Sequence, residues 1–157
     1  MTKPFFSVLI LFWKSAQFLA DNLQALEEQS FKDFEVILLD NGAEEPPDPS
    51  VLSLHPELDL HLLRSETNLG FAAGNNLAAR QAQGEYVILL NNDAFPQPDW
   101  LATLHQFAQS YPGHCFASRL LQADNPNVLD GEWNVYHASG LAWRQNHSRP
   151  TSFGSAS

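Results

Sequence analysis

The sequence has little cysteine, little positive charge and no long hydrophobic run. One cysteine among 157 residues permits no internal disulfide and favours a reducing compartment such as the cytosol. Only eight lysines and arginines stand against 18 aspartates and glutamates, a formal net charge of −10, which argues against a nucleic-acid partner. No stretch approaches the ~20 apolar residues that span a bilayer. The six histidines lack the spacings typical of metal-binding motifs.

What the sequence does contain is an alternation of strand-like and helix-like segments. Runs rich in apolar residues indicate strands at 5–12, 34–39, 58–63, 86–90 and 114–121, with 86–90 buried on both faces and Cys115 buried within the last. Helical spacing predicts one helix after the N-cap Ser15, one ending near Gln83 with Gly84 as its cap, and one beginning at Pro98. The order predicts an α/β fold, a mostly parallel central sheet with helices on both faces.

The composition changes along the chain in a way that predicts three regions. Residues 1–121 carry the α/β pattern. Residues 122–144 read as loop with one or two short strands. The polar residues 145–157 show no core-forming pattern, and we expect a disordered tail there.

Polar clusters follow three of the predicted parallel strands where each strand ends. They are Trp13-Lys14-Ser15, Asp40-Asn41-Gly42 and Asn91-Asn92-Asp93. Ligands of α/β sheets bind outside the carboxyl ends of the strands, so the clusters should meet at one site. A carboxylate such as Asp93 suits Mg²⁺ or Mn²⁺, and one such as Asp40 can accept hydrogen bonds from a nucleobase or a ribose. Each cluster taken alone is equally compatible with a simple turn.

The run from Asn68 to Asn76 places glycines and small side chains at the start of a predicted helix. Backbone N–H groups at such a position favour anions. The glycines at 70 and 74 do not fit Gly-x-Gly-x-x-Gly, which argues against a nicotinamide enzyme, and the phosphate-loop Lys-Ser/Thr pair is absent.

Four segments together resemble the nucleotide-binding half of a family-2 glycosyltransferase with the GT-A fold, in particular its rhamnosyltransferase-like branch. In family order they are Phe6–Ile10, Gln29–Gly42, Asn68–Asn76 and Gly84–Asp93. The resemblance implies an inverting transfer from a UDP- or dTDP-sugar to a saccharide or lipid-linked acceptor, with Mn²⁺ or Mg²⁺ as cofactor. It also implies a cytoplasmic enzyme of bacterial cell-surface polysaccharide synthesis, with peripheral association of the full-length protein at the inner face of the membrane.

The resemblance also implies roles for single residues. Asp40 matches the acid that recognises the nucleobase, and Asp93 matches the last acid of the Asp-x-Asp motif, which holds the metal on the diphosphate. Asn91 stands where the first acid of that motif usually stands and is the second predicted metal contact. The remaining predicted nucleotide contacts are Asn41, Asn68, Gly70, Phe71, Asn75 and Asn92.

The family's catalytic base, an Asp or Glu in a Glu-Asp type motif, has no match. The acids after Asp99 are Asp124, Asp130 and Glu132, and none lies in such a motif. We therefore expect the N-terminal portion of a longer enzyme, with residues 122–144 beginning the acceptor side and with the base and acceptor site missing. Two alternatives remain: a non-catalytic nucleotide-binding module, and a receiver domain, which needs an acidic pair where this chain has Trp13-Lys14.

Overall fold

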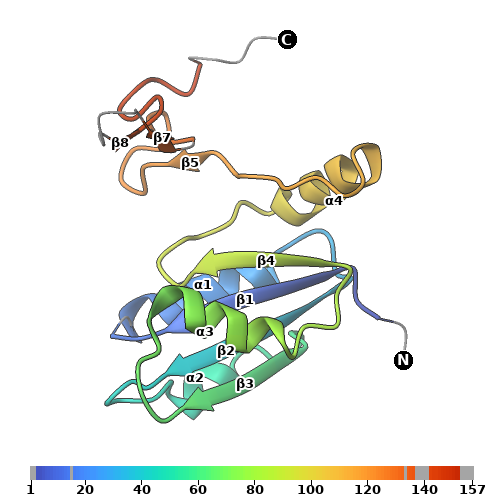
Figure 1. Ribbon diagram of the computed structural model, residues 1–157, viewed down its shortest axis with the longest axis vertical. Coiled ribbons are helices and arrows are strands. Elements are labelled where there is room, and N and C mark those ends of the chain that lie inside the picture. Colours follow the sequence, from blue (N-terminus) through green and yellow to red (C-terminus); the bar gives the residue numbers. More distant parts are fainter. Residues whose placement is uncertain (1–2, 15, 133, 137–141, 153–157) are drawn as a thin grey trace. The chain divides into compact units, whose positions relative to one another are not determined.

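The computed structural model describes residues 3–14, 16–132, 134–136 and 142–152 (Figure 1). The chain divides into two compact units, one ending at Ser110 and the other beginning at Tyr111. Each unit has its own sheet pairing, so each is described by itself. None of the helices in the described ranges is long and apolar enough to cross a membrane.

A four-stranded parallel sheet forms the centre of the first unit. Its strands lie in the order β3-β2-β1-β4. Strand β1 is Phe6–Phe12, β2 is Phe34–Asn41, β3 is Leu60–Ser65 and β4 is Tyr86–Asn91. The helices are α1 (Ala16–Glu27), α2 (Pro49–Ser53), α3 (Gly70–Ala79) and α4 (Trp100–Ser110). The predicted α/β architecture is confirmed, and the apolar runs of β1 and β2 are buried as expected for central strands.

Helices cover both faces of this sheet. On one face, Val8 of β1 belongs to a core that includes Leu23 of α1 and Leu101 of α4. On the other face, Leu9 belongs to a core that includes Ala78 of α3. Because side chains alternate between the faces along a strand, consecutive residues at a strand end serve different sides of the sheet.

Strand β4 differs from its prediction because it is an edge strand. The run Tyr86–Leu90 was expected to be buried on both faces, yet Val87 and Leu89 are 47% and 54% exposed. Helix α3 packs against β1 and β2 on that face, which leaves these two side chains open. An apolar run alone does not reveal how far the covering helix extends over the sheet.

The helix boundaries also require corrections. Helix α3 ends at Ala79, with Arg80 as its C-cap, so Gly84 is not the cap. Gly84 leads into β4, where an added Cβ would lie 2.5 Å from the backbone nitrogen of Ser7, and this close approach explains the glycine. Helix α4 begins at Trp100, after Pro98. The predicted N-cap Ser15 lies outside the described residues.

The second unit contains two short antiparallel pairs. They are β5 (Leu120–Leu121) with β6 (Leu129–Gly131), and β7 (Asn134–Tyr136) with β8 (Ala142–Arg144). The predicted strand 114–121 is wrong for residues 114–119, since only Leu120 and Leu121 pair with another strand within the described ranges. Cys115, predicted to be buried, is exposed. Residues 145–152, assigned above to a disordered tail, hydrogen-bond to 127–132; for example, the Ser148 nitrogen donates to the Leu129 carbonyl at 2.9 Å.

Candidate functional site

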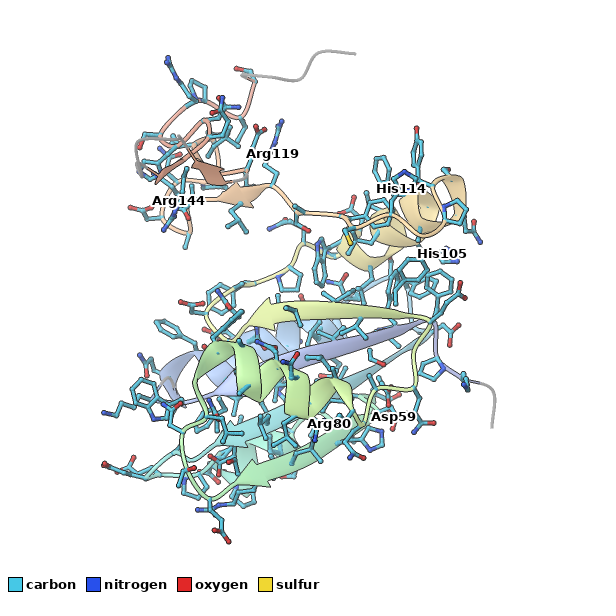
Figure 2. All side chains as sticks on the ribbon, viewed as in Figure 1. Asp59, Arg80, His105, His114, Arg119 and Arg144 are labelled. Atoms are coloured by element: carbon cyan, nitrogen blue, oxygen red, sulfur yellow. The ribbon has the colours of Figure 1, made fainter. Side chains whose placement is uncertain are left out.

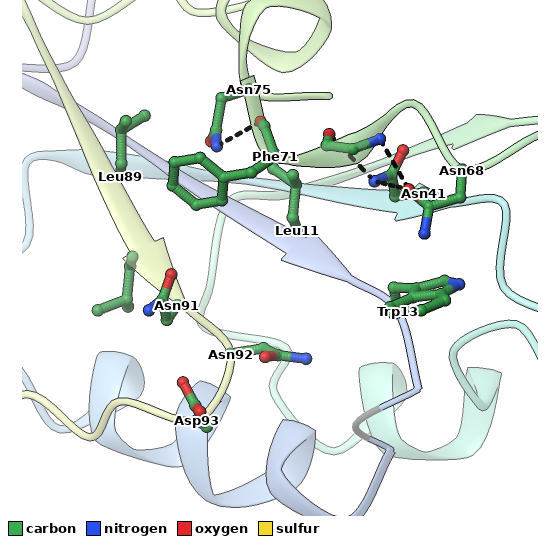
Figure 3. A pocket seen from close by; sticks show the side chains of 12 residues that line it. Leu11, Trp13, Asn41, Asn68, Phe71, Asn75, Leu89, Asn91, Asn92 and Asp93 are labelled. Carbon is green, nitrogen blue, oxygen red and sulfur yellow. Dashed lines mark hydrogen bonds between the residues drawn. The ribbon is translucent and has the colours of Figure 1, made fainter. Parts of the chain in front are cut away.

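A cavity of about 350 Å³ lies at the edge of the first unit where the parallel strands end (Figure 3). Its walls come from the ends of β1, β2 and β4 and from the start of α3. The volume is at the lower end of the range for small-molecule sites, and the position is the one expected in α/β sheets. The lining residues are Leu11, Trp13, Asn41, Asn68, Gly70, Phe71, Asn75, Leu89, Leu90, Asn91, Asn92 and Asp93.

Every predicted site residue except Asp40 lines this cavity. The polar part of the lining consists mainly of five asparagines, and Asp93 is its one carboxylate. Amides offer both donors and acceptors, whereas an ionised carboxylate offers acceptors alone. The site is therefore suited to a polar ligand with mixed hydrogen-bonding groups rather than to a bare cation.

Asp40 faces the other side of the sheet. It lies beside Phe12 of β1, which belongs to the core under α1, and its side chain is 1% exposed. Its Oδ1 accepts a hydrogen bond from the Ala43 nitrogen at 2.9 Å, and its Oδ2 lies 3.4 Å from Nε of Arg64. The carboxylate thus holds the turn after β2, and the structure does not bring it to the cavity.

Asn41 joins the end of β2 to the start of α3. Its Oδ1 accepts from the Leu69 nitrogen at 3.0 Å, and its Nδ2 donates to Oδ1 of Asn68 at 3.2 Å. Oδ1 of Asn68 also accepts from the Gly70 nitrogen at 2.7 Å. These bonds fix the first residues of α3 against the sheet, where they form one wall of the cavity (Figure 3).

Gly42 allows the turn after β2 to pack directly against the segment that precedes α3. Its φ is +70°, and an added Cβ would lie 2.3 Å from the carbonyl carbon of Thr67. Any other residue at this position would have to adopt a left-handed backbone, and its side chain would overlap the backbone at Thr67.

The turn after β4 is held from α1. Nδ2 of Asn22 donates to the carbonyl oxygens of Asn91 and Ala94, at 3.2 and 2.6 Å. Within this turn Asp93 is exposed at the cavity, whereas Asn92 is 9% exposed and its Nδ2 has no hydrogen-bond partner in the described part of the chain. A buried donor without a partner is uncommon in folded proteins.

The cluster predicted after the first strand reaches the cavity through Trp13, whereas Asn22 of α1 was missed from sequence. Trp13 lines the cavity with a side chain that is 43% exposed, and Nζ of Lys14 lies 4.7 Å from its ring centroid. Its place at the end of the first strand was the available signal. For Asn22, the signal was a polar residue within the apolar stripe of a helix, between Leu19 and Leu23.

The residues at the cavity fit a divalent metal only if a ligand shares it. The described residues contain no group of three or more His, Cys, Asp or Glu side chains that could hold an ion. Asp93 and Asn91 both line the cavity, and their carboxylate and amide oxygens are ligands of the kind that Mg²⁺ and Mn²⁺ prefer. Mg²⁺ commonly binds through one or two carboxylates together with substrate phosphates and water. The donor set therefore fits a metal held jointly with a diphosphate.

Two of the three late acids form ion pairs within the second unit. Glu132 pairs with Arg119 at 2.7 Å, and Asp130 pairs with Arg144 (Figure 2 labels both arginines). Asp124 is exposed in the loop between β5 and β6. Asp130 and Glu132 thus balance arginines within their own unit.

Comparison with known proteins identifies the family. The profile described as glycosyl transferase family 2 matches residues 7–150. The chain belongs to glycosyl transferase family 2. Over 130 residues it is 26% identical to a cholesterol galactosyltransferase of Borreliella burgdorferi, a match that covers 83% of this chain and 33% of that protein.

Two solved structures give the fold of this family-2 chain. The mannosyltransferase PcManGT from Pyrobaculum calidifontis, in complex with GDP-Man and Mn²⁺, has a TM-score of 0.65 at 25% identity over 78% of this chain and 36% of that one. S. aureus TarS 1–349 in complex with UDP-GlcNAc has a TM-score of 0.60 at 22% identity over 76% and 41%. The GT-A fold is confirmed, and the chain spans less than half the length of these relatives. The rhamnosyltransferase-like branch stays a prediction.

Proposed function

We propose that this chain binds a nucleotide-diphosphate sugar in the cavity and forms the donor-binding part of an inverting sugar transferase. The observation that carries the proposal is the cavity itself, in which Asp93 and five asparagines converge at the carboxyl edge of a parallel sheet. The two family neighbours were solved with GDP-Man and with UDP-GlcNAc, which supports a sugar nucleotide as the ligand class.

The nucleoside would lie between β1 and the start of α3. Trp13 offers an aromatic face, and bases stack on such faces with about 1–3 kcal/mol per base. Asn41 and Asn68 border the same side of the cavity (Figure 3). Because Asp40 is buried away from the cavity, we assign the contact with the base to Asn41 and the support of the turn to Asp40. The base would be uracil or thymine, as the resemblance implies.

The diphosphate would lie toward Asp93 and Asn91. These two side chains would hold Mn²⁺ or Mg²⁺ on the phosphate oxygens, and the bound metal would stabilise the charge of the departing diphosphate. Asn92 offers a buried Nδ2 donor in the same turn. The chain's own part is thus to bind, orient and partly neutralise the leaving group.

The acceptor would be a saccharide or lipid-linked hydroxyl, met in the cytoplasm or at the inner face of the membrane. Its attack needs a base within ~3 Å of the hydroxyl. Asp130 and Glu132 pair with arginines in the second unit, and Asp93 serves the metal. We therefore assign the base to neither Asp130 nor Glu132. The same ion pairs favour the second candidate for this chain alone, a module that binds nucleotide sugars without turnover.

The test is calorimetric titration of the chain with UDP, dTDP, GDP and ADP, each in Mn²⁺ and in EDTA. At least one diphosphate should bind, and Mn²⁺ should tighten its binding but not that of the matching nucleoside. Failure of all four to bind in Mn²⁺ would reject the proposal.

A further inference from the structure

Helix α1 has a polar residue, Asn22, on the face that packs against the core, where the other buried residues are leucines. Its buried stripe consists of Leu19, Asn22, Leu23 and Leu26, at the spacing of an amphipathic helix. Asn22 is fully buried. An apolar side chain here would leave no polar atoms to satisfy, and buried polar groups cost free energy unless they are hydrogen-bonded. The reason for this asparagine therefore lies in what it binds.

Asn22 binds the backbone of the turn that bears Asp93. Its Nδ2 donates to the carbonyl of Asn91 at 3.2 Å and to that of Ala94 at 2.6 Å, so the two bonds bracket Asp93. The Ala94 nitrogen closes the same turn by donating to the Asn91 carbonyl at 3.1 Å. Two bonds use both Nδ2 hydrogens, while Oδ1 has no partner among the described residues. The two hydrogen bonds from Nδ2 are thus present even though Oδ1 of the same side chain is buried without a partner in the described ranges.

We infer that Asn22 is a positioning residue for the metal-binding turn, a role that rests on the proposed function. It is not among the residues that line the cavity, so it would act through the backbone it holds. By fixing the carbonyls on both sides of Asp93, it sets the direction in which the carboxylate projects. Groups that orient metal ligands commonly change metal affinity by about 10–100-fold when they are removed.

Gln29 provides a matched control from the same part of the chain. It follows α1 and is fully buried, like Asn22. Its Nε2 donates to the Gln97 carbonyl at 2.8 Å, and its Oε1 accepts from the Leu101 nitrogen at 3.0 Å. It therefore anchors the segment that leads into α4, and none of its hydrogen bonds reaches residues 91–94. Loss of Gln29 should destabilise the fold without turning Asp93.

The experiment compares Asn22→Leu and Gln29→Leu with the unmodified chain. Each is titrated with the tightest-binding nucleoside diphosphate of the calorimetric panel, in Mn²⁺ and in EDTA, and the nucleotide complex is titrated with Mn²⁺. For Asn22→Leu we expect Mn²⁺ affinity to fall by about 10–100-fold with little change of binding in EDTA. For Gln29→Leu we expect the Mn²⁺ affinity to stay unchanged, although urea denaturation should show both variants to be less stable.

A second variant covers the case in which Asn22→Leu does not fold. Asn22→Ser is small, and its hydroxyl cannot hold both carbonyls, so it should show the same selective loss. Retention of full Mn²⁺ affinity in a folded Asn22 variant, or an equal loss in Gln29→Leu, would overturn the inference. If the unmodified chain binds no nucleoside diphosphate in Mn²⁺, the proposed function fails instead, and the two failures are thereby distinguished.

Discussion

Asp40 and Asn41 are consecutive residues at the end of β2, and their side chains lie on opposite faces of the sheet. Asp40 is buried against Ala43 and Arg64, while Asn41 lines the cavity. Strand alternation makes this division unavoidable, because a shift of one residue moves a side chain to the other face. The acid that the sequence resemblance assigns to the base thus lies outside the lining of the cavity.

Substitutions at these two positions should therefore have different effects. Asp40→Asn loses a charge-assisted hydrogen bond to the Ala43 nitrogen and should lower the free energy of unfolding by about 1.5–3 kcal/mol, with nucleoside affinity nearly unchanged. Asn41→Ala should lower nucleoside affinity by about 10-fold, the equivalent of a neutral hydrogen bond. It should also lower the free energy of unfolding, because it removes the hydrogen bonds to Leu69 and Asn68. Calorimetry with uridine and thymidine, combined with urea denaturation, separates the effects. A selective loss of nucleoside binding in Asp40→Asn would show that Asp40 contacts the nucleobase after all.

Asp93→Ala should remove the metal-dependent part of nucleotide binding. The side chain is exposed, so its loss should leave the fold intact, as circular dichroism would show. Asp99→Ala is the control, because Asp99 is an exposed acid outside the cavity and its loss changes the net charge equally. If Mn²⁺ tightens diphosphate binding to Asp93→Ala as much as to Asp99→Ala, Asp93 is not the metal ligand.

Gly42→Ala should destabilise the chain far more than Gly113→Ala. Both glycines have a left-handed backbone, with φ of +70° and +76°, and this conformation costs an alanine about 1–2 kcal/mol. At Gly113 an added Cβ meets nothing within 4 Å, whereas at Gly42 it overlaps the backbone of Thr67. Overpacking should add about 1–3 kcal/mol or more at Gly42. Equal midpoints of urea denaturation for the two variants would show that the segments around Gly42 can separate freely.

The chain alone should bind a donor without transferring its sugar. The test supplies purified chain, Mn²⁺, a UDP- or dTDP-sugar and a saccharide- or lipid-linked acceptor, and measures product by mass spectrometry. We expect no more than slow donor hydrolysis, because Asp130 and Glu132 are paired with arginines. Sustained turnover would place the base among the residues of this chain, and Asp124→Asn would be the first variant to examine.

Much of the architecture followed from the sequence because it depends on local patterns. The apolar runs of β2 and β4 end in short polar residues, and those ends help to form the cavity. The asparagines at 68 and 75, which the family resemblance implies as nucleotide contacts, also line the cavity. Predicting the strand ends needs only periodicity and the rule that ligands gather at the carboxyl edge of a parallel sheet.

The errors share a different origin, since each depends on contacts between distant segments. Val87 and Leu89 read as buried because nothing in their own run tells how far α3 reaches across the sheet. Asn22 went unnoticed because its partners lie 69 and 72 residues further along the chain. The stretch 114–119 has strand-like composition but forms no strand pairing with the residues that the structure describes. Contacts between distant segments cannot be predicted from a short stretch of sequence.

The most direct test of the central claim is to map where a nucleoside diphosphate binds. At 17.5 kDa the chain is suited to amide-resolved NMR, and the titration requires only isotope-labelled protein, UDP or dTDP, and Mg²⁺. We predict that shifts concentrate at Trp13, at Gly70 and Phe71, and at Asn92 and Asp93, while amides at the opposite edge of the sheet stay unchanged. Binding that leaves these residues unshifted and perturbs another surface would contradict the assignment of the cavity as the donor site.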